Sequence, residues 1–181
     1  MIPNFKYYGS IDVRPFLSAI DNISSEDWNK YTFRQDLFHM HSRTRTIPVL
    51  YDIDYNVGIG KRSSFYDIFK ESIDYASKVI SELTNTKCKI VRFIITNLPA
   101  NTTVDTHKDS AESFIVYSRV HIPIITNDKV LFTVDNETIN MPVGEIYEIN
   151  NGDKLHGVVN NSNEDRLHII LDWHDETQSL I

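Results

Sequence analysis

The sequence predicts a mainly β fold, a β-sandwich or jelly roll with helices on its N-terminal side (class α+β). From residue 89 onward, apolar and polar residues alternate with a period of two, as they do in half-buried strands. Asn, Asp, Gly and Pro interrupt this alternation at short intervals, so turns and not helices connect the strands. The predicted strands cover residues 89–98, 113–125, 129–134, 145–149 and 166–173.

Helical spacing dominates the sequence before residue 89. Residues 12–21 carry apolar side chains at helical intervals, with Pro15 tolerated in the first turn, and a second helix start is expected near Ser24. The best strand candidate in this half covers residues 46–51. The clearest helix has apolar residues at intervals of three and four over five turns: Phe65, Ile68, Phe69, Ile73, Ala76, Val79, Ile80 and Leu83.

Length and composition fit one globular domain over residues 1–181. We expect residues 1–88 to form a helical lead-in and cover, and residues 89–181 to form the β core. A net charge of -7 without a basic stripe argues against binding of nucleic acid.

The cellular setting is predicted from the cysteine content and from hydropathy. A lone cysteine, Cys88, cannot form an internal disulfide, which suits a reducing compartment. The first ten residues contain no apolar run typical of a signal peptide. No segment approaches the ~18 consecutive apolar residues of a membrane-spanning helix. These features predict a cytoplasmic protein without a membrane partner.

Three polar residues in the β half have the composition of a metal site. His107 and Asp109 are two residues apart, so in an extended backbone their side chains share one face. His156 would join them from a distant strand, with Gly152 and Gly157 permitting a close backbone approach. Two His and one carboxylate form the facial triad of non-haem Fe(II) oxygenases. The alternative is two ordinary loop residues and a satisfied core histidine.

Two strands place an Arg and a His together on one face. Alternation puts Arg166 and His168 opposite the apolar residues of their strand, and it does the same for Arg119 and His121. An Arg directed into an apolar interior is costly unless an anion pairs with it. For Arg166 the far carboxylate of 2-oxoglutarate is a suitable partner. For Arg119 the partner is a carboxylate of the co-substrate or the substrate, or else an internal Asp or Glu.

Basic residues of the N-terminal half are weaker candidates. Arg34, Arg43 and Arg45 lie in an irregular segment that could supply contacts to a substrate, or could be a solvated loop. His39 and His41 have the spacing of metal ligands, but no carboxylate or third His lies at a comparable position.

The stretch 92–173 resembles the aspartyl/asparaginyl β-hydroxylase family, which includes bacterial free-proline hydroxylases. Residues 1–90 match this family only loosely. The resemblance rests on motifs in a specific order and spacing: Leu98-Pro99 leading to His107-Lys108-Asp109, then Ser118-Arg119-Val120-His121-Ile122-Pro123, residues 150–156, residues 160–166 and Leu171-Asp172-Trp173.

The resemblance implies a double-stranded β-helix (a cupin-like jelly roll) that uses Fe(II), 2-oxoglutarate and O2. It implies that Arg166 anchors the C5 carboxylate of 2-oxoglutarate, and that Arg119 and His121 lie near this co-substrate. The metal ligands that it implies are His107, Asp109 and His156.

The function expected from this resemblance is hydroxylation of an unactivated C–H bond of an amino acid, with 2-oxoglutarate decarboxylated to succinate. The substrate is either a free, proline-like amino acid or an Asp or Asn residue in a peptide. The presence of Asp109 places the protein with the full-triad members and favours hydroxylation over halogenation. The alternative is a cupin-like metal-binding module that is not catalytic or does not use 2-oxoglutarate. The oligomeric state is not predicted.

Overall fold

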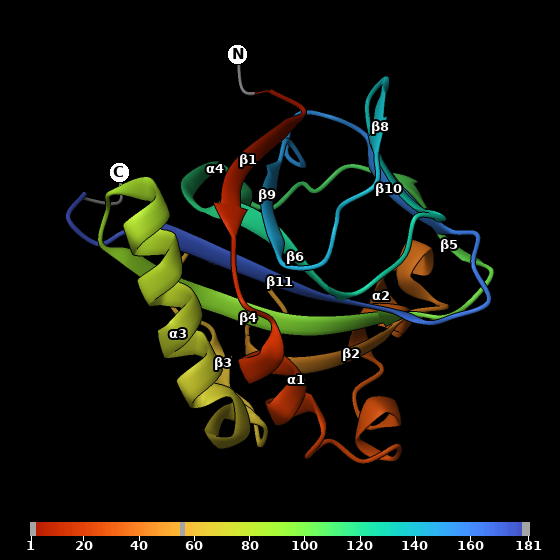
Figure 1. Ribbon diagram of the computed structural model, residues 1–181, viewed down its shortest axis with the longest axis horizontal. Coiled ribbons are helices and arrows are strands. Elements are labelled where there is room, and N and C mark those ends of the chain that lie inside the picture. Colours follow the sequence, from red (N-terminus) through yellow and green to blue (C-terminus); the bar gives the residue numbers. More distant parts are fainter. Residues whose placement is uncertain (1–2, 55–56, 179–181) are drawn as a thin grey trace.

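The computed structural model describes residues 3–54 and 57–178 and contains two antiparallel sheets (Figure 1). The larger sheet has seven strands, in the order β1 (Phe5–Ser10), β9 (Glu145–Ile149), β6 (Ser118–Ile125), β11 (Arg166–Asp175), β4 (Cys88–Leu98), β2 (Arg45–Tyr51) and β3 (Lys61–Arg62). The smaller sheet has four strands, in the order β5 (Thr102–His107), β10 (His156–Asn160), β7 (Val130–Val134) and β8 (Glu137–Ile139).

Two helices cover one face of the larger sheet, and the smaller sheet lies on its other side (Figure 1). The covering helices are α1 (Arg14–Ile20) and α3 (Tyr66–Thr84). α3 ends at Thr84, and the next residue, Asn85, has a left-handed φ of 53°, a conformation that commonly terminates helices. The remaining helical segments are short: η1 (Asp27–Asn29), α2 (Phe33–Leu37), η2 (His39–His41) and α4 (Ser113–Val116).

Strand alternation divides the core into two layers. The layer between the larger sheet and the helices is apolar and includes Phe93 of β4, which packs on Phe16 and Phe69. The layer between the two sheets contains Leu98, Val104, Phe132 and other apolar residues. Polar side chains of β6 and β11 face this second layer, while the intervening apolar residues face the helices. The larger sheet therefore presents its polar residues to the space between the sheets.

The predicted fold class is confirmed: the protein is mainly β with few helices and has the jelly-roll arrangement. The helix expected around residues 65–83 is α3, residues 12–21 contain α1, and residues 46–51 lie in β2. The first 88 residues also supply strands β1, β2 and β3 to the larger sheet.

Two predictions of local structure are wrong. The helix expected near Ser24 is only the turn η1, where the hydroxyl of Ser24 donates to the carboxylate of Asp27 at 2.7 Å. The strand expected over 113–125 begins with helix α4, and β6 starts at Ser118. Residues 114–117 are four consecutive apolar residues, a run whose periodicity cannot distinguish a helix from a strand.

Among residues 3–54 and 57–178, no helix is both long and apolar enough to cross a membrane.

Candidate active site

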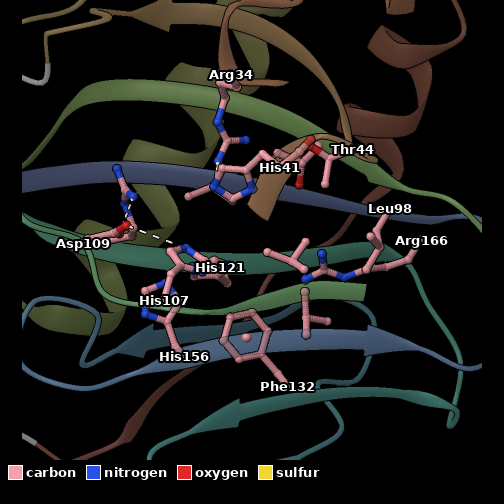
Figure 2. Close-up of a pocket in the computed structure, with 16 residues that line it drawn as sticks. Arg34, His41, Thr44, Leu98, His107, Asp109, His121, Phe132, His156 and Arg166 are labelled. Atoms are coloured by element: carbon pink, nitrogen blue, oxygen red, sulfur yellow. Dashed lines mark hydrogen bonds and ion pairs between the residues drawn. The ribbon is translucent and has the colours of Figure 1, made fainter. Parts of the chain in front are cut away.

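Three candidate metal ligands converge in a cavity between the two sheets (Figure 2). His107 is the last residue of β5 and His156 is the first of β10, and the two are direct partners in the antiparallel pairing of these strands. Their ring centroids are 4.3 Å apart. Asp109 follows β5 by two residues. One ligand atom from each of the three lies within 4.8 Å of the others, so a single ion can contact all three.

Backbone carbonyls orient the two imidazoles. Nδ1 of His107 donates to the carbonyl of Asp105 at 2.8 Å, and Nδ1 of His156 faces the carbonyl of Lys154 at 3.5 Å. In this arrangement Nδ1 carries the proton, and the lone pair on Nε2 of each ring is available to a metal, as is usual for metal-binding His. Burial lowers the pKa of His156 to about 4. The His156 ring is therefore neutral at neutral pH and can coordinate a metal.

Asp109 is held by two donors on the same oxygen. Its Oδ2 accepts from Nη1 of Arg119 at 2.9 Å and from the amide of Asn151 at 2.6 Å. Burial by itself would raise the pKa of Asp109, but Arg119 and its other neighbours outweigh it, and the pKa is lowered. The carboxylate is therefore ionised, and Oδ1, 3.9 Å from Nε2 of His107, remains for a metal.

Arg119 connects this carboxylate to a second one. Its Nε and Nη2 donate to Asp172 of β11 at 2.7 and 2.9 Å. Asp172 is 1% exposed and also pairs with Arg92 at 3.4 Å. Two guanidinium groups and two carboxylates thus form a partly buried network in which each charge has an opposite partner.

Arg166 reaches the cavity from β11, away from the metal ligands (Figure 2). Its Nη2 donates to Nδ1 of His168. Its Nε has no hydrogen-bond partner, and within the described residues no carboxylate lies within 4.0 Å of the guanidinium. Burial lowers the pKa of Arg166 to about 9, which leaves it charged at neutral pH. A buried cation without a carboxylate partner is costly, so this end of the cavity is suited to an anion.

His121 lies between the metal ligands and Arg166 in Figure 2. Both of its ring nitrogens are buried without a hydrogen-bond partner among the described residues, and its ring packs against Phe132 and His168. Burial, and then the charge of Arg166, lower the pKa of His121 well below its usual value. Unpaired buried polar atoms at His121, His168 and Arg166 are typical of a site that receives a polar ligand.

All six residues proposed from the sequence line this cavity: His107, Asp109, His156, Arg166, Arg119 and His121. Arg119 forms the internal salt bridge that was its alternative interpretation, and its role toward a co-substrate stays a prediction. The role of His121 also stays a prediction.

The two glycines near His156 differ in their surroundings. A Cβ on Gly157 would lie 3.0 Å from the carbonyl oxygen of Val104 and 3.2 Å from the amide nitrogen of Thr106, so the close approach expected there exists. A Cβ on Gly152 would meet only a carbonyl oxygen at 3.8 Å, and the expectation of a close approach there is wrong.

Four further residues contribute to the cavity or support it. Arg34 and His41 line it from the N-terminal half, whereas Arg43, Arg45 and His39 are exposed. Asn151 and Asp172 were not recognised from the sequence. Alternation along β11 could have found Asp172, because it lies on the same face as Arg166 and His168.

Comparisons with known proteins assign the family. Residues 16–175 match the model of the aspartyl/asparaginyl β-hydroxylase family. A crystal structure of an oxidoreductase of the 2OG-Fe(II) oxygenase family from Burkholderia pseudomallei is 14% identical with a TM-score of 0.56, covering 73% of this chain and 67% of that chain. This similarity shows a common fold.

Other solved structures resemble shorter parts of the protein. AerE from Microcystis aeruginosa is 18% identical with a TM-score of 0.37, over 51% of this chain and 42% of its own. A cupin domain from Bordetella pertussis Tohama I is 17% identical with a TM-score of 0.37, over 48% of this chain and 83% of its own. A search of curated protein sequences gives no match. On the family match over residues 16–175, the chain belongs to the aspartyl/asparaginyl β-hydroxylase family and is an oxidoreductase.

Proposed function

We propose that the protein is an Fe(II)- and 2-oxoglutarate-dependent oxygenase that hydroxylates an unactivated C–H bond of an amino acid, either free or in a peptide. In the overall reaction, R–H, O2 and 2-oxoglutarate give R–OH, succinate and CO2. One observation carries the proposal: the His107–Asp109–His156 cluster shares one cavity with Arg166, a buried cation for which the described residues provide no carboxylate.

The donor set fits Fe(II). Two neutral imidazoles and one carboxylate are the ligands of non-haem Fe(II) oxygenases, and three protein ligands leave three coordination positions open. His107, Asp109 and His156 would hold the ion. The chemistry supplied by bound Fe(II) is the activation of O2, coupled to oxidative decarboxylation of the keto acid and insertion of one oxygen atom into a C–H bond.

The cavity also suits a linear dicarboxylate. The candidate metal ligands lie at one end of the cavity and the guanidinium of Arg166 lies at the other (Figure 2). Apolar Leu98, Phe132 and Val158 line the wall between them. A guanidinium can take a carboxylate through two parallel hydrogen bonds, which fixes the direction of the ligand. We assign the C5 carboxylate of 2-oxoglutarate to Arg166 and its keto end to the metal. His121, with its unpaired nitrogens, is a further donor toward this ligand.

Residues around the cluster orient its side chains for metal binding. Arg119 and Asn151 hold one oxygen of Asp109, so the other is presented in a fixed direction. The backbone carbonyl of Asp105 fixes the tautomer of His107. The apolar wall between the sheets limits the access of water, which strengthens the electrostatic contacts inside the cavity.

The proposal is tested under anaerobic conditions by adding Fe(II) and 2-oxoglutarate to the metal-free protein and recording the visible spectrum. We expect a weak charge-transfer band between the metal and the keto acid. The variant Arg166→Ala should require at least about tenfold more 2-oxoglutarate for the same band, since a charged hydrogen bond is lost. The variant His107→Ala should give no band.

The matched control is Arg43→Gln, which removes an exposed Arg outside the cavity and should leave the band unchanged. Tight metal binding without any band would contradict the proposal and favour a cupin-like module that does not use 2-oxoglutarate. A normal band in the His107→Ala protein would contradict the assignment of the metal ligands.

A further inference from the structure

A second buried arginine reaches the cavity from the N-terminal half of the protein. Arg34 lies on α2, and His41 ends the turn η2 that follows (Figure 2). Both side chains line the cavity that holds the candidate metal ligands. Figure 2 shows Arg34 and Arg166 reaching the cavity from different sides. The proposed function uses Arg166 and leaves Arg34 without a role.

The charge of Arg34 is not balanced by any described residue. Arg34 is 5% exposed, and its guanidinium donates to Oγ1 of Thr46 at 3.3 Å and to Nε2 of His41 at 3.0 Å. Its Nε is buried and has no partner. Among residues 3–54 and 57–178, no Asp or Glu oxygen lies within 4.0 Å of it, whereas Arg119 contacts two carboxylates. A buried guanidinium without an anion is costly, so its retention here indicates an anionic ligand.

His41 sets the distance between this cation and the candidate metal ligands. Its ring centroid lies 5.2 Å from that of His107, with the two rings nearly perpendicular. Its Nε2 accepts from Arg34, so the neutral ring carries its proton on Nδ1. One imidazole therefore separates the guanidinium from the metal cluster. A ligand that spans this gap must have several bonds between its carboxylate and the atom that lies beside the metal.

We propose that the substrate is a free amino acid whose α-carboxylate pairs with Arg34, while a C–H bond of its side group lies next to the metal cluster. This inference rests on the proposed function and names the class of its substrate. An Asp residue in a peptide fits less well, because its reacting carbon would be directly bonded to the carboxylate that Arg34 would hold. A peptide Asn has no carboxylate to offer. A second, separate cation for the substrate also leaves Arg166 free for 2-oxoglutarate.

The test uses the protein loaded anaerobically with Fe(II) and 2-oxoglutarate. Each of the twenty free amino acids is added, and its α-carboxamide is added in a parallel titration. The change in the visible band reports binding beside the metal, and succinate release in air reports turnover. We expect at least one free amino acid to perturb the band and stimulate succinate release. Its α-carboxamide should bind about tenfold more weakly or worse, because it lacks the negative charge of the carboxylate.

Variants separate Arg34 from the co-substrate site. Arg34→Gln should raise the half-saturating concentration of that amino acid by about tenfold or more, while the half-saturating concentration of 2-oxoglutarate changes by less than about twofold. Arg34→Lys keeps the charge and should restore part of the affinity. Arg43→Gln removes a nearby exposed Arg and should change neither value.

Three results would overturn the inference while leaving the proposed function intact. They are equal binding of acid and amide, loss of 2-oxoglutarate binding instead of amino-acid binding in Arg34→Gln, and a normal 2-oxoglutarate band that none of the twenty amino acids perturbs. The acid–amide comparison in the unmodified protein remains decisive if the Arg34 variants do not fold. Absence of the band in the unmodified protein would remove the proposed function, and this inference with it.

Discussion

Arg119 donates from Nη1 to Oδ2 of Asp109 at 2.9 Å, and the same guanidinium holds Asp172 of β11 at 2.7 and 2.9 Å. A candidate metal ligand on a loop is thereby tied to the central strands of the larger sheet. The link explains how Asp109, two residues beyond the end of β5, can keep a fixed direction. It also makes Arg119 a positioning residue for the metal cluster.

The first prediction concerns this link. Arg119→Lys keeps one charge but cannot contact both carboxylates with the geometry of a guanidinium, so Asp109 should lose its fixed orientation. We expect the affinity for Co(II) or Fe(II) to fall by about 10- to 100-fold, the usual effect of removing a residue that orients a metal ligand. The measurement is an anaerobic metal titration monitored by absorbance.

The control for this prediction is Arg14→Lys, because Arg14 forms an exposed ion pair with Asp12 far from the cavity. It should bind the metal as the unmodified protein does. Unchanged metal affinity in Arg119→Lys would mean that Asp109 needs no such support.

The second prediction uses the close contact of β5 and β10. A Cβ on Gly157 would lie 3.0 Å from the carbonyl oxygen of Val104 and 3.2 Å from the amide nitrogen of Thr106, so Gly157→Ala must push the two strands apart. Because these strands carry His107 and His156, we expect weaker metal binding and a loss of about 1–3 kcal/mol in the free energy of unfolding. Metal titration and urea denaturation measure the two effects.

Gly152→Ala is the matched control, since its Cβ would meet only one backbone oxygen at 3.8 Å. It should bind metal normally. Equal behaviour of the two variants would show that the spacing of β5 and β10 does not determine the cluster.

The polar residues of the cavity could be predicted from the sequence where strand alternation was clear. The alternation of β11 correctly separated Arg166 and His168 from the apolar residues, and β6 did the same for Arg119 and His121. His156 was expected on a distant strand, but the bounds of β5 and β10 were not predicted. Residues 102–107 are mostly polar, and residues 156–160 contain two adjacent valines and no alternation of apolar and polar residues. The direct pairing of His107 with His156 was therefore not foreseen, although both residues were proposed as ligands.

Contacts that depend on the packing of distant segments could not be derived in this way. Arg34 lies on a helix of five residues, and neither its burial nor its position in the cavity has a periodic signal. The same holds for Asn151, which reaches Asp109 from a loop. Local periodicity assigns faces within one strand, but only the assembled sheets determine which loops meet above them.

The third prediction concerns the core layer on the far side of the larger sheet. Phe93 is 0% exposed and packs on Phe16 and Phe69 at ring distances of 6.4 and 6.3 Å. Phe93→Ala should lower the free energy of unfolding by about 3–5 kcal/mol, because it removes a large buried ring and leaves a cavity. Urea denaturation measures this change.

Ile68→Ala provides the comparison for this core variant. Ile68 lies on α3 and is 37% exposed, so its truncation should lower the free energy of unfolding by no more than about 1 kcal/mol. Phe93 faces the helices and not the cavity, so folded Phe93→Ala should bind metal with unchanged affinity. Similar losses of stability in the two variants would contradict the burial of Phe93, and weaker metal binding by folded Phe93→Ala would contradict the division of the core into two layers.

The fourth prediction concerns the pH dependence of stability. Cys88 begins β4 and is 7% exposed, and burial raises the pKa of its thiol to about 12. Unfolding restores the pKa of a solvated thiol, so the unfolded protein loses this proton at a lower pH than the folded protein. The contribution of Cys88 is therefore fully present below about pH 9 and is lost as the pH rises toward 12.

Cys88→Ala removes this titration while Tyr and Lys residues titrate as before. Between about pH 9 and pH 10.5, the free energy of unfolding should fall by about 1–2 kcal/mol more in the unmodified protein than in Cys88→Ala. Urea denaturation at each pH measures this difference. The thiol of the folded protein should also resist alkylation by iodoacetamide at about pH 8 and react once urea unfolds the protein. Parallel pH profiles for the two proteins, or rapid alkylation without urea, would mean that the Cys88 thiol is not shielded from water.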